Sequence, residues 1–162
     1  MSFHSQLKEK IVTKEVAFRS MNGQRLKGRK MVFTNGCFDI LHPGHVDYLA
    51  QARDLGGCLV LGLNSDDSVK RLNKAPNRPV NTETSRAHVL SALACVDMIV
   101  IFNEDTPLEL ITYLKPDVLV KGGDWKVEDI VGGDVVKSNG GDVITIPLLE
   151  GFSTTKLIEK LK

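Results

Sequence analysis

Residues 31–63 read MVFTNGCFDILHPGHVDYLAQARDLGGCLVLGL, and the order of patterns within this stretch decides the fold. Met31–Thr34 is a short apolar β run, and Asn35–Gly44 is a connection rich in turn residues. Val46–Leu55 has the pattern of a helix that two glycines end, and Cys58–Leu63 is a second apolar run. A helix between two strands predicts a crossover connection, which makes the two strands parallel.

The same alternation continues along the chain. Further strands are predicted at Met98–Phe102, Val118–Lys121 and Val143–Ile146. Further helices are predicted at Thr13–Leu26, Asp66–Leu72, Thr82–Ala94, Thr106–Leu114 and Ser153–Leu161, and turns at Gly132-Gly133-Asp134 and Gly140-Gly141-Asp142. Because the strands are apolar almost throughout, both faces of the sheet must be covered. We therefore expect an α/β fold, a Rossmann-like three-layer sandwich with a parallel sheet of about five strands. It should form a single domain over residues 1–162, with residues 1–29 as an N-terminal helical extension.

The composition restricts the classes of partner. The 162 residues carry 21 Lys plus Arg and 20 Asp plus Glu, a formal net charge of +1. This balance argues against nucleic-acid and membrane partners, because polyanion binders and polybasic anchors need clustered cations. No apolar stretch approaches the ~20 residues that span a bilayer. The three cysteines are widely spaced and form no zinc-ligand pattern, so we expect a reduced, cytoplasmic protein with no metal site of its own.

The connection after the first strand holds two histidines, His42 and His45, on either side of Pro43-Gly44. At this spacing they would project from one side of the first turn of a helix, where free N–H groups attract anions. Imidazole donors there would stabilise phosphate oxygens in a transition state. One alternative is a loop histidine followed by a helix-capping histidine. A zinc site is disfavoured because a third ligand is missing nearby, although Asp39 could in principle help. A P-loop and a dinucleotide-binding fingerprint are both absent.

A second candidate feature is a basic segment between residues 68 and 82, which contains no acid. Its four cations are Lys70, Arg71, Lys74 and Arg78. The segment is either a solvated basic loop or a mobile arm that neutralises a triphosphate and an acceptor phosphate. A nucleic-acid patch is disfavoured, because the segment has no aromatic side chain on which a base would stack.

Two stretches later in the chain combine small and polar residues. Lys121–Trp125 reads KGGDW after a predicted strand, where two glycines allow a nucleotide to approach the backbone and Asp124 could accept from ribose hydroxyls. Trp125 would either stack on a base or cover the loop. Glu150–Thr155 opens the last predicted helix, and its hydroxyls and free N–H groups are suited to phosphate, or simply cap the helix.

Together these motifs resemble a known superfamily. Residues 34–45, TNGCFDILHPGH, are similar to the His-x-Gly-His signature of the nucleotidylyltransferases, which transfer a nucleoside monophosphate from a nucleoside triphosphate and release pyrophosphate. From Thr13 to Leu161 the chain resembles one family among them, the D-glycero-β-D-manno-heptose 1-phosphate adenylyltransferases of lipopolysaccharide core synthesis. Further segments that carry this resemblance are Asn64–Asp66, Arg78–Asn81, Glu104–Pro107, Val120–Asp124 and Ser153–Thr155. A chain of 162 residues has no room for the kinase often fused to this domain, so a stand-alone enzyme and a separate heptose kinase are expected.

The resemblance implies transfer of AMP from ATP, with Mg2+, to heptose 1-phosphate, giving ADP-heptose and pyrophosphate. The catalytic residues that it implies are His42, His45, Lys70 and Lys74, and the acceptor-binding residues are Asp39 and Arg78. The nucleotide-binding residues that it implies are Thr34, Asn35, Gly36, Phe38, Asn64, Lys121, Gly122, Asp124, Ser153, Thr154 and Thr155. The pattern does not decide which of the two lysines contacts phosphate. A homodimer is expected as the commonest soluble oligomer.

Several functions besides this one stay open at this point. Residues 148–151 read LLEG where cytidylyltransferases of the superfamily carry Arg-Thr-Glu-Gly, and the missing arginine counts against a glycerol 3-phosphate cytidylyltransferase. An FAD synthetase-like enzyme and a non-catalytic nucleotide-binding module also stay open. Arg86 is expected to form a structural ion pair on its helix, and Cys37 to fill space in the loop.

Overall fold

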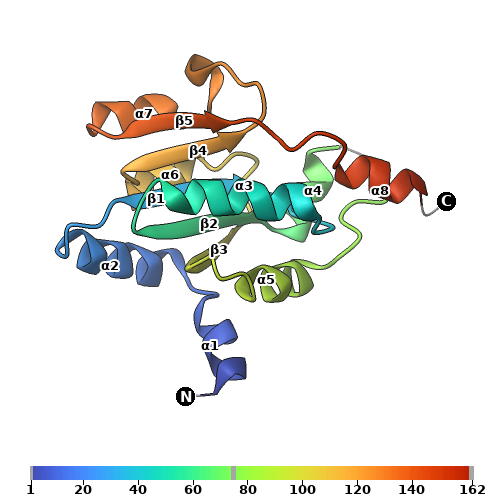
Figure 1. Cartoon of the computed structure of the whole chain (residues 1–162), viewed down its shortest axis with the longest axis horizontal. Coiled ribbons are helices and arrows are strands. Elements are labelled where there is room, and N and C mark those ends of the chain that lie inside the picture. The colour runs from blue at the N-terminus through green and yellow to red at the C-terminus, as the bar shows by residue number, and fades with distance from the viewer. Residues whose placement is uncertain (1, 74–75, 161–162) are drawn as a thin grey trace.

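The computed structural model describes residues 2–73 and 76–160, and these residues contain one sheet of five parallel strands (Figure 1). The strands are β1 (Met31–Gly36), β2 (Cys58–Asn64), β3 (Met98–Phe102), β4 (Val118–Gly122) and β5 (Asp142–Ile146). Their order across the sheet is β3-β2-β1-β4-β5. The predicted α/β fold with a parallel sheet is confirmed, and every predicted strand is present with small shifts at its ends.

Helices occupy the connections between the strands. They are α1 (Phe3–Glu9), α2 (Lys14–Arg25), α3 (Pro43–Asp54), α4 (Asp66–Arg71), α5 (Glu83–Ser91), α6 (Leu108–Leu114), α7 (Gly133–Ser138) and α8 (Thr154–Lys160), with a 3-10 turn η1 (Val127–Asp129). All the predicted helices are present. The helix predicted from Val46 begins earlier, at Pro43, because proline is well suited to the first helical position and His42 is the N-cap.

One predicted turn is wrong. Gly133 and Asp134 form the first turn of α7, and only Gly132 before them has a positive φ, of 81°. The sequence does not predict this helix because it is short and begins without a Ser, Thr, Asp or Asn cap. The second predicted turn, at Gly140-Gly141, is present and leads directly into β5.

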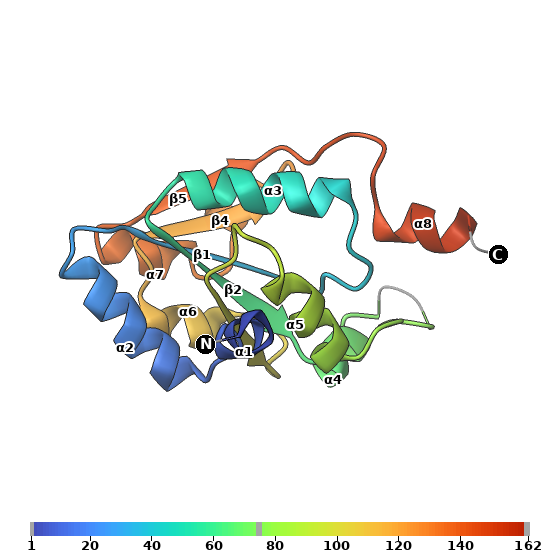
Figure 2. The same cartoon turned by 60° about the horizontal axis from the view of Figure 1, so that its bottom comes forward.

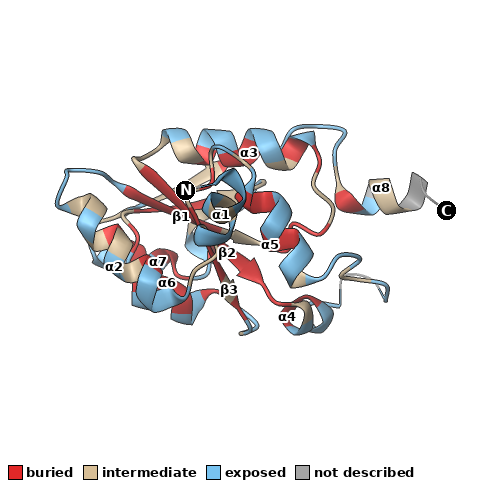
Figure 3. Cartoon of the chain, turned by 90° about the horizontal axis from the view of Figure 1, so that it is seen from below, coloured by how far each residue is buried: buried red, intermediate tan, exposed pale blue. Residues whose placement is uncertain are grey.

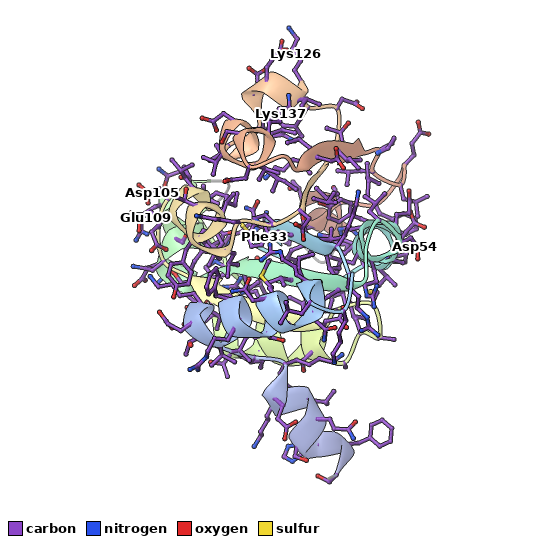
Figure 4. The ribbon with its side chains drawn as sticks, turned by 90° about the vertical axis from the view of Figure 1, so that its left-hand side faces the viewer. Phe33, Asp54, Asp105, Glu109, Lys126 and Lys137 are labelled. Atoms are coloured by element: carbon purple, nitrogen blue, oxygen red, sulfur yellow. The ribbon has the colours of Figure 1, made fainter. Side chains whose placement is uncertain are left out.

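Two helical layers cover the sheet (Figure 2). On one face, Leu49 of α3 and Leu90 of α5 pack with Leu61 of β2 in one buried apolar cluster. On the other face, α2, α6 and α7 pack against the opposite side chains of the strands, which include Phe33 in the interior (Figure 4). Buried residues accordingly concentrate in the strands and on the inner helix faces (Figure 3). The predicted three-layer sandwich is confirmed.

The first 29 residues divide into two parts. Helix α2 belongs to a covering layer, since Ala17 and Met21 are fully buried. Helix α1 buries none of its residues and projects from the body (Figures 1 and 4). Between them the chain joins the edge of the sheet, where the Ile99 N–H donates to the Lys10 carbonyl at 2.7 Å. No helix in the described part of the chain is long and apolar enough to cross a membrane.

Candidate active site

A cavity of about 400 Å3 lies at the carboxyl ends of β1 and β4, where the strand order reverses direction. Such a switch point is where α/β sheets of this kind bind ligands. Its walls come from the end of β1 and the start of α3, the end of β4, Arg78, and the segment that joins β5 to α8. The lining residues are Asn35, Gly36, Cys37, Phe38, His42, Gly44, His45, Tyr48, Arg78, Lys121, Gly122, Trp125, Leu148, Leu149, Phe152, Ser153, Thr154 and Thr155.

Two stacked histidines form one wall of this cavity. The rings of His42 and His45 lie 3.7 Å apart between centroids and 18° apart in plane, and Phe38 meets the His45 ring at 5.1 Å. Both Nδ1 atoms are buried, and no described residue provides either with a hydrogen-bond partner. Burial lowers the pKa of His42, and burial, helped by the nearby His42 and Arg78, lowers the pKa of His45 to about 4. Both imidazoles are therefore mainly neutral at pH 7, with one N–H each, and a backbone hydrogen bond with Ile40 opposes part of the decrease in the pKa of His45.

The histidine pair is suited to an anion. Buried polar atoms without partners are rare in native proteins, and at a cavity they point to a ligand. A bound phosphate would accept from the imidazoles, and its negative charge would favour their protonated forms. The adjoining start of α3 adds backbone N–H groups and the positive end of the helix dipole.

Close packing at the cavity explains two glycines. A Cβ at Gly44 would lie 3.1 Å from the His42 ring and 3.2 Å from the Phe152 Cβ, so a larger residue would push the histidine from its place. A Cβ at Gly36 would lie 2.7 Å from the ring of Phe38. Phe38 itself has φ 43°, a left-handed conformation that is uncommon outside glycine.

Asp39 fastens the loop that carries Arg78. Its side chain is fully buried and accepts from Arg78 Nε at 3.0 Å, from the Val80 N–H at 2.8 Å and from the Asn81 N–H at 3.0 Å. Burial alone would raise the pKa of Asp39, but the hydrogen bonds from Asn81 and Val80 and the Arg78 guanidinium outweigh it and hold this pKa below its ordinary value. Arg78 lines the cavity and Asp39 does not, so Asp39 acts on the site through Arg78.

Arg86 joins the ends of two strands to the same loop. Its buried guanidinium donates to the carbonyl of Cys37 at 2.7 Å, the carbonyl of Asn64 at 2.8 Å and the carbonyl of Asn81 at 3.0 Å. It also pairs with Asp66 at 2.8 Å. The expected ion pair is present, but its partner lies on α4 rather than on the same helix. Asn64 is held in this network and does not line the cavity.

The opposite wall combines apolar and hydroxyl groups. Trp125 is half exposed, with Lys121 Nζ 5.8 Å from its ring centroid. The start of α8 adds the hydroxyls of Ser153, Thr154 and Thr155. Residues that the sequence motifs did not indicate here are Tyr48, Leu148, Leu149 and Phe152. They carry no chemical signature, and only the return of the chain from β5 places the last three at the cavity.

Three other predicted residues lie away from the cavity lining, and a fourth falls outside the described residues. Thr34 is fully buried, and its hydroxyl lies 2.5 Å from the Tyr48 hydroxyl. Asp124 is exposed to solvent and is not one of the residues that line the cavity. Lys70 is exposed on α4 and pairs with Asp67 at 3.1 Å, while Lys74 lies outside the described residues. Within the described chain, no group of three His, Cys, Asp or Glu side chains is arranged to hold a metal ion.

The chain is similar in sequence to several known proteins. The cytidylyltransferase-like family matches residues 33–160. The bifunctional protein HldE of Trichlorobacter lovleyi is 55% identical over 158 residues, which cover 98% of this chain and 32% of that protein. HldE of Syntrophotalea carbinolica is 59% identical over 138 residues, or 85% of this chain and 28% of that protein. The chain thus spans about a third of the length of these relatives.

Two solved structures are similar as well. The lipopolysaccharide core biosynthesis protein from Thermoplasma volcanium has a TM-score of 0.61 and 30% identity, over 75% of this chain and 98% of that one. A pantoate-beta-alanine ligase from Francisella tularensis, complexed with beta-gamma ATP and beta-alanine, has a TM-score of 0.60 over 91% of this chain and 75% of that one. At 15% identity the ligase shares the fold alone.

Proposed function

Because the chain belongs to the cytidylyltransferase-like family, we propose that it transfers AMP from ATP to D-glycero-β-D-manno-heptose 1-phosphate, giving ADP-heptose and pyrophosphate. The observation that supports nucleotidyl transfer is the stacked histidine pair in the switch-point cavity, whose two buried Nδ1 atoms have no hydrogen-bond partner among the described residues. The choice of acceptor rests on the motif resemblance to heptose 1-phosphate adenylyltransferases and on the 55% identity to the bifunctional protein HldE. The similar solved structure of a lipopolysaccharide core biosynthesis protein agrees with this choice.

The proposed step is an in-line displacement at the α-phosphorus of ATP. A phosphate oxygen of the acceptor forms the new P–O bond, while the bond to the bridging oxygen breaks and its electron pair leaves with pyrophosphate. The attacking phosphate is already anionic, so the step needs no strong general base. Catalysis therefore depends on positioning and on stabilising the charge that develops on the phosphate oxygens.

In this proposal His42 and His45 donate to the oxygens of the phosphates that separate. Arg78, held by Asp39, faces the acceptor phosphate, and the hydroxyls at the start of α8 contact the triphosphate. Magnesium enters as part of the substrate MgATP.

In this proposal Lys70 and Lys74 supply cations that neutralise the triphosphate. The exposed pair between Lys70 and Asp67 is worth only ~0–1 kcal/mol, so a triphosphate can replace that carboxylate.

The remaining parts of the proposal follow from the substrates. A kinase-type reaction must supply the sugar 1-phosphate, and a cytoplasmic location gives access to ATP. A homodimer is the default assembly. Nucleic acid and membrane are not proposed as partners.

The test is pyrophosphate release across a matrix of ATP, CTP and GTP against heptose 1-phosphate, glycerol 3-phosphate and FMN. ATP with heptose 1-phosphate should dominate. The variant His45→Ala should lose roughly 2–4 kcal/mol of transition-state stabilisation, while His88→Ala, which changes an exposed histidine on α5, should match the parent. Activity only with CTP would show that the proposed nucleotide substrate is wrong. No pyrophosphate release with any pair of substrates would favour a non-catalytic nucleotide-binding module.

A further inference from the structure

The sheet separates at the point where the cavity begins. Strands β1 and β4 are paired only at Val32–Val118 and Phe33–Leu119. Their outer neighbours continue further, since β1 stays paired with β2 up to Gly36 and β4 stays paired with β5 up to Gly122. The gap between β1 and β4 is therefore confined to the strand ends that form the cavity. Backbone N–H and C=O groups beyond the last pair need other hydrogen-bond partners there.

The Tyr48 hydroxyl lies in that gap. Tyr48 is on α3, three residues after His45, and only 5% of its surface is exposed. Its hydroxyl donates to the carbonyl of Val120 on β4 at 3.3 Å. It also lies 2.5 Å from the Thr34 hydroxyl on β1, which must be the donor in that contact because a tyrosine has one O–H. One oxygen thus bridges the two strands just beyond their last paired residues.

The ring of Tyr48 lines the cavity and lies against the end of β4. A Cβ at Gly122 would lie 3.1 Å from the Tyr48 ring and 2.8 Å from Leu148, so the strand end fits against this ring only as glycine. Burial raises the pKa of Tyr48 to about 12, although the Thr34 bond lowers it somewhat, so the hydroxyl keeps its proton at physiological pH.

We propose that Tyr48 is a positioning residue whose hydroxyl holds the ends of β1 and β4 apart and fixes the start of α3 above them. The proposal rests on the proposed nucleotidyl transfer for its link to rate. The bridge sets the distance between the two walls of the cavity, one with Asn35 and Gly36 and the other with Lys121 and Gly122. It also ties the helix that carries His42 and His45 to both strands.

Removing the hydroxyl has a defined geometric consequence. In Tyr48→Phe, the Thr34 hydroxyl can donate directly to the Val120 carbonyl, in a bond of about 2.8 Å in place of the bridged arrangement. The strand ends would then approach one another by an ångström or more. A displacement of about 1 Å between reacting groups lowers a rate by up to ~100-fold.

The experiment compares Tyr48→Phe with two controls in the full chain. Tyr113→Phe removes the hydroxyl of the other tyrosine, which lies on the outer side of α6, away from the cavity lining. Ile111→Val weakens the core under the opposite sheet face without reaching the cavity. We measure kcat and KM, ATP binding by calorimetry, thermal stability, and the crystal structure of Tyr48→Phe.

Tyr48→Phe should lower kcat about 10- to 100-fold, and its crystal structure should show Thr34 bonded directly to Val120. Both controls should keep kcat within twofold, including Ile111→Val at reduced stability.

Unchanged strand separation, or a kcat within twofold of the parent, would overturn the role of Tyr48. Failure of the proposed function is a separate result, because it appears in the parent protein as no pyrophosphate release. In that case the role of Tyr48 is tested by the crystal structure and the ATP dissociation constant of Tyr48→Phe. Closer ends of β1 and β4 together with at least fivefold weaker ATP binding would support the inference, and an unchanged dissociation constant would overturn it.

Discussion

The replacement Asp39→Asn tests whether one buried carboxylate holds the Arg78 loop in place. The parent carboxylate is enclosed by three donors, which are Arg78 Nε and the N–H groups of Val80 and Asn81. An asparagine has a single acceptor oxygen, and its NH2 group must face donors. It also leaves the buried Arg78 without the charge that balances it.

The magnitude follows from these contacts. At least two charge-assisted hydrogen bonds are lost, each worth ~1.5–3 kcal/mol, and breaking a buried ion pair by removing one partner costs ~3–5 kcal/mol. Relief of the desolvation of the carboxylate offsets part of this loss. We expect a decrease of about 3 kcal/mol in the free energy of unfolding, which corresponds to a decrease of ~6–12 °C in Tm for a chain of this size.

The assay is urea and thermal unfolding of Asp39→Asn beside Asp47→Asn. Asp47 is exposed on α3 and accepts from Gln51 alone among the described hydrogen bonds, so its replacement should change stability by less than about 0.5 kcal/mol. In kinetics, Asp39→Asn should raise KM for the phosphorylated acceptor, because Arg78 loses its fixed position.

Since folding holds the pKa of Asp39 below its ordinary value, its contribution to stability is complete above about pH 4 and is lost as the pH falls through the lower pKa of the folded state. The difference from the parent should therefore be constant from pH 5 to 8 and shrink in acid. A loss of stability under 1 kcal/mol at pH 7 would refute the reasoning.

Two further predictions concern backbone strain and histidine titration. Gly132→Ala should lower the free energy of unfolding in urea by about 2 kcal/mol, because φ is +81° and the new Cβ would lie 2.8 Å from Ile111. Gly140→Ala has a similar φ of +80° but open space around the new Cβ, so it should lower the free energy of unfolding by only about 1 kcal/mol. Equal decreases for the two variants would contradict the packing argument. The pKa of His45 falls from 6.5 to about 4 on folding, so the unfolded chain binds more protons between these values and the parent should lose about 2 kcal/mol of stability from pH 6.5 to 4. In His45→Gln the free energy of unfolding should lack this decrease between pH 6.5 and 4. If the free energy of unfolding varied with pH in the same way in parent and variant, burial would not shift the pKa of His45.

Much of the fold could be predicted from the sequence because its signals are local. Continuous apolar runs such as Cys58–Leu63 identify buried parallel strands, and Thr13 and Thr82 are visible helix caps that the structure uses. Helix α7 could not be predicted in this way, because it is short, begins with glycine and is held by the burial of Val136 against the sheet.

The candidate site was predictable only where chemistry and spacing coincide. The two histidines could be selected because their separation suits one side of a helix turn, and the structure stacks their rings at the cavity. Thr34 has a polar group beside the same strand end, but its hydroxyl forms a hydrogen bond with the Tyr48 hydroxyl. The two residues lie on different elements, so no local sequence pattern reveals this contact. Leu148 and Phe152 resemble ordinary core residues, and only the path of the chain after β5 brings them to the cavity.

The central claim is that this chain moves AMP from ATP to a sugar 1-phosphate. The most direct measurement follows two labels, with heptose 1-phosphate as acceptor and ATP labelled either at the α- or at the γ-phosphorus. Attack at the α-phosphorus predicts that the α label appears in ADP-heptose and the γ label in pyrophosphate, in equal amounts. Transfer of the γ label to the sugar, or retention of the α label in ADP, would contradict the account.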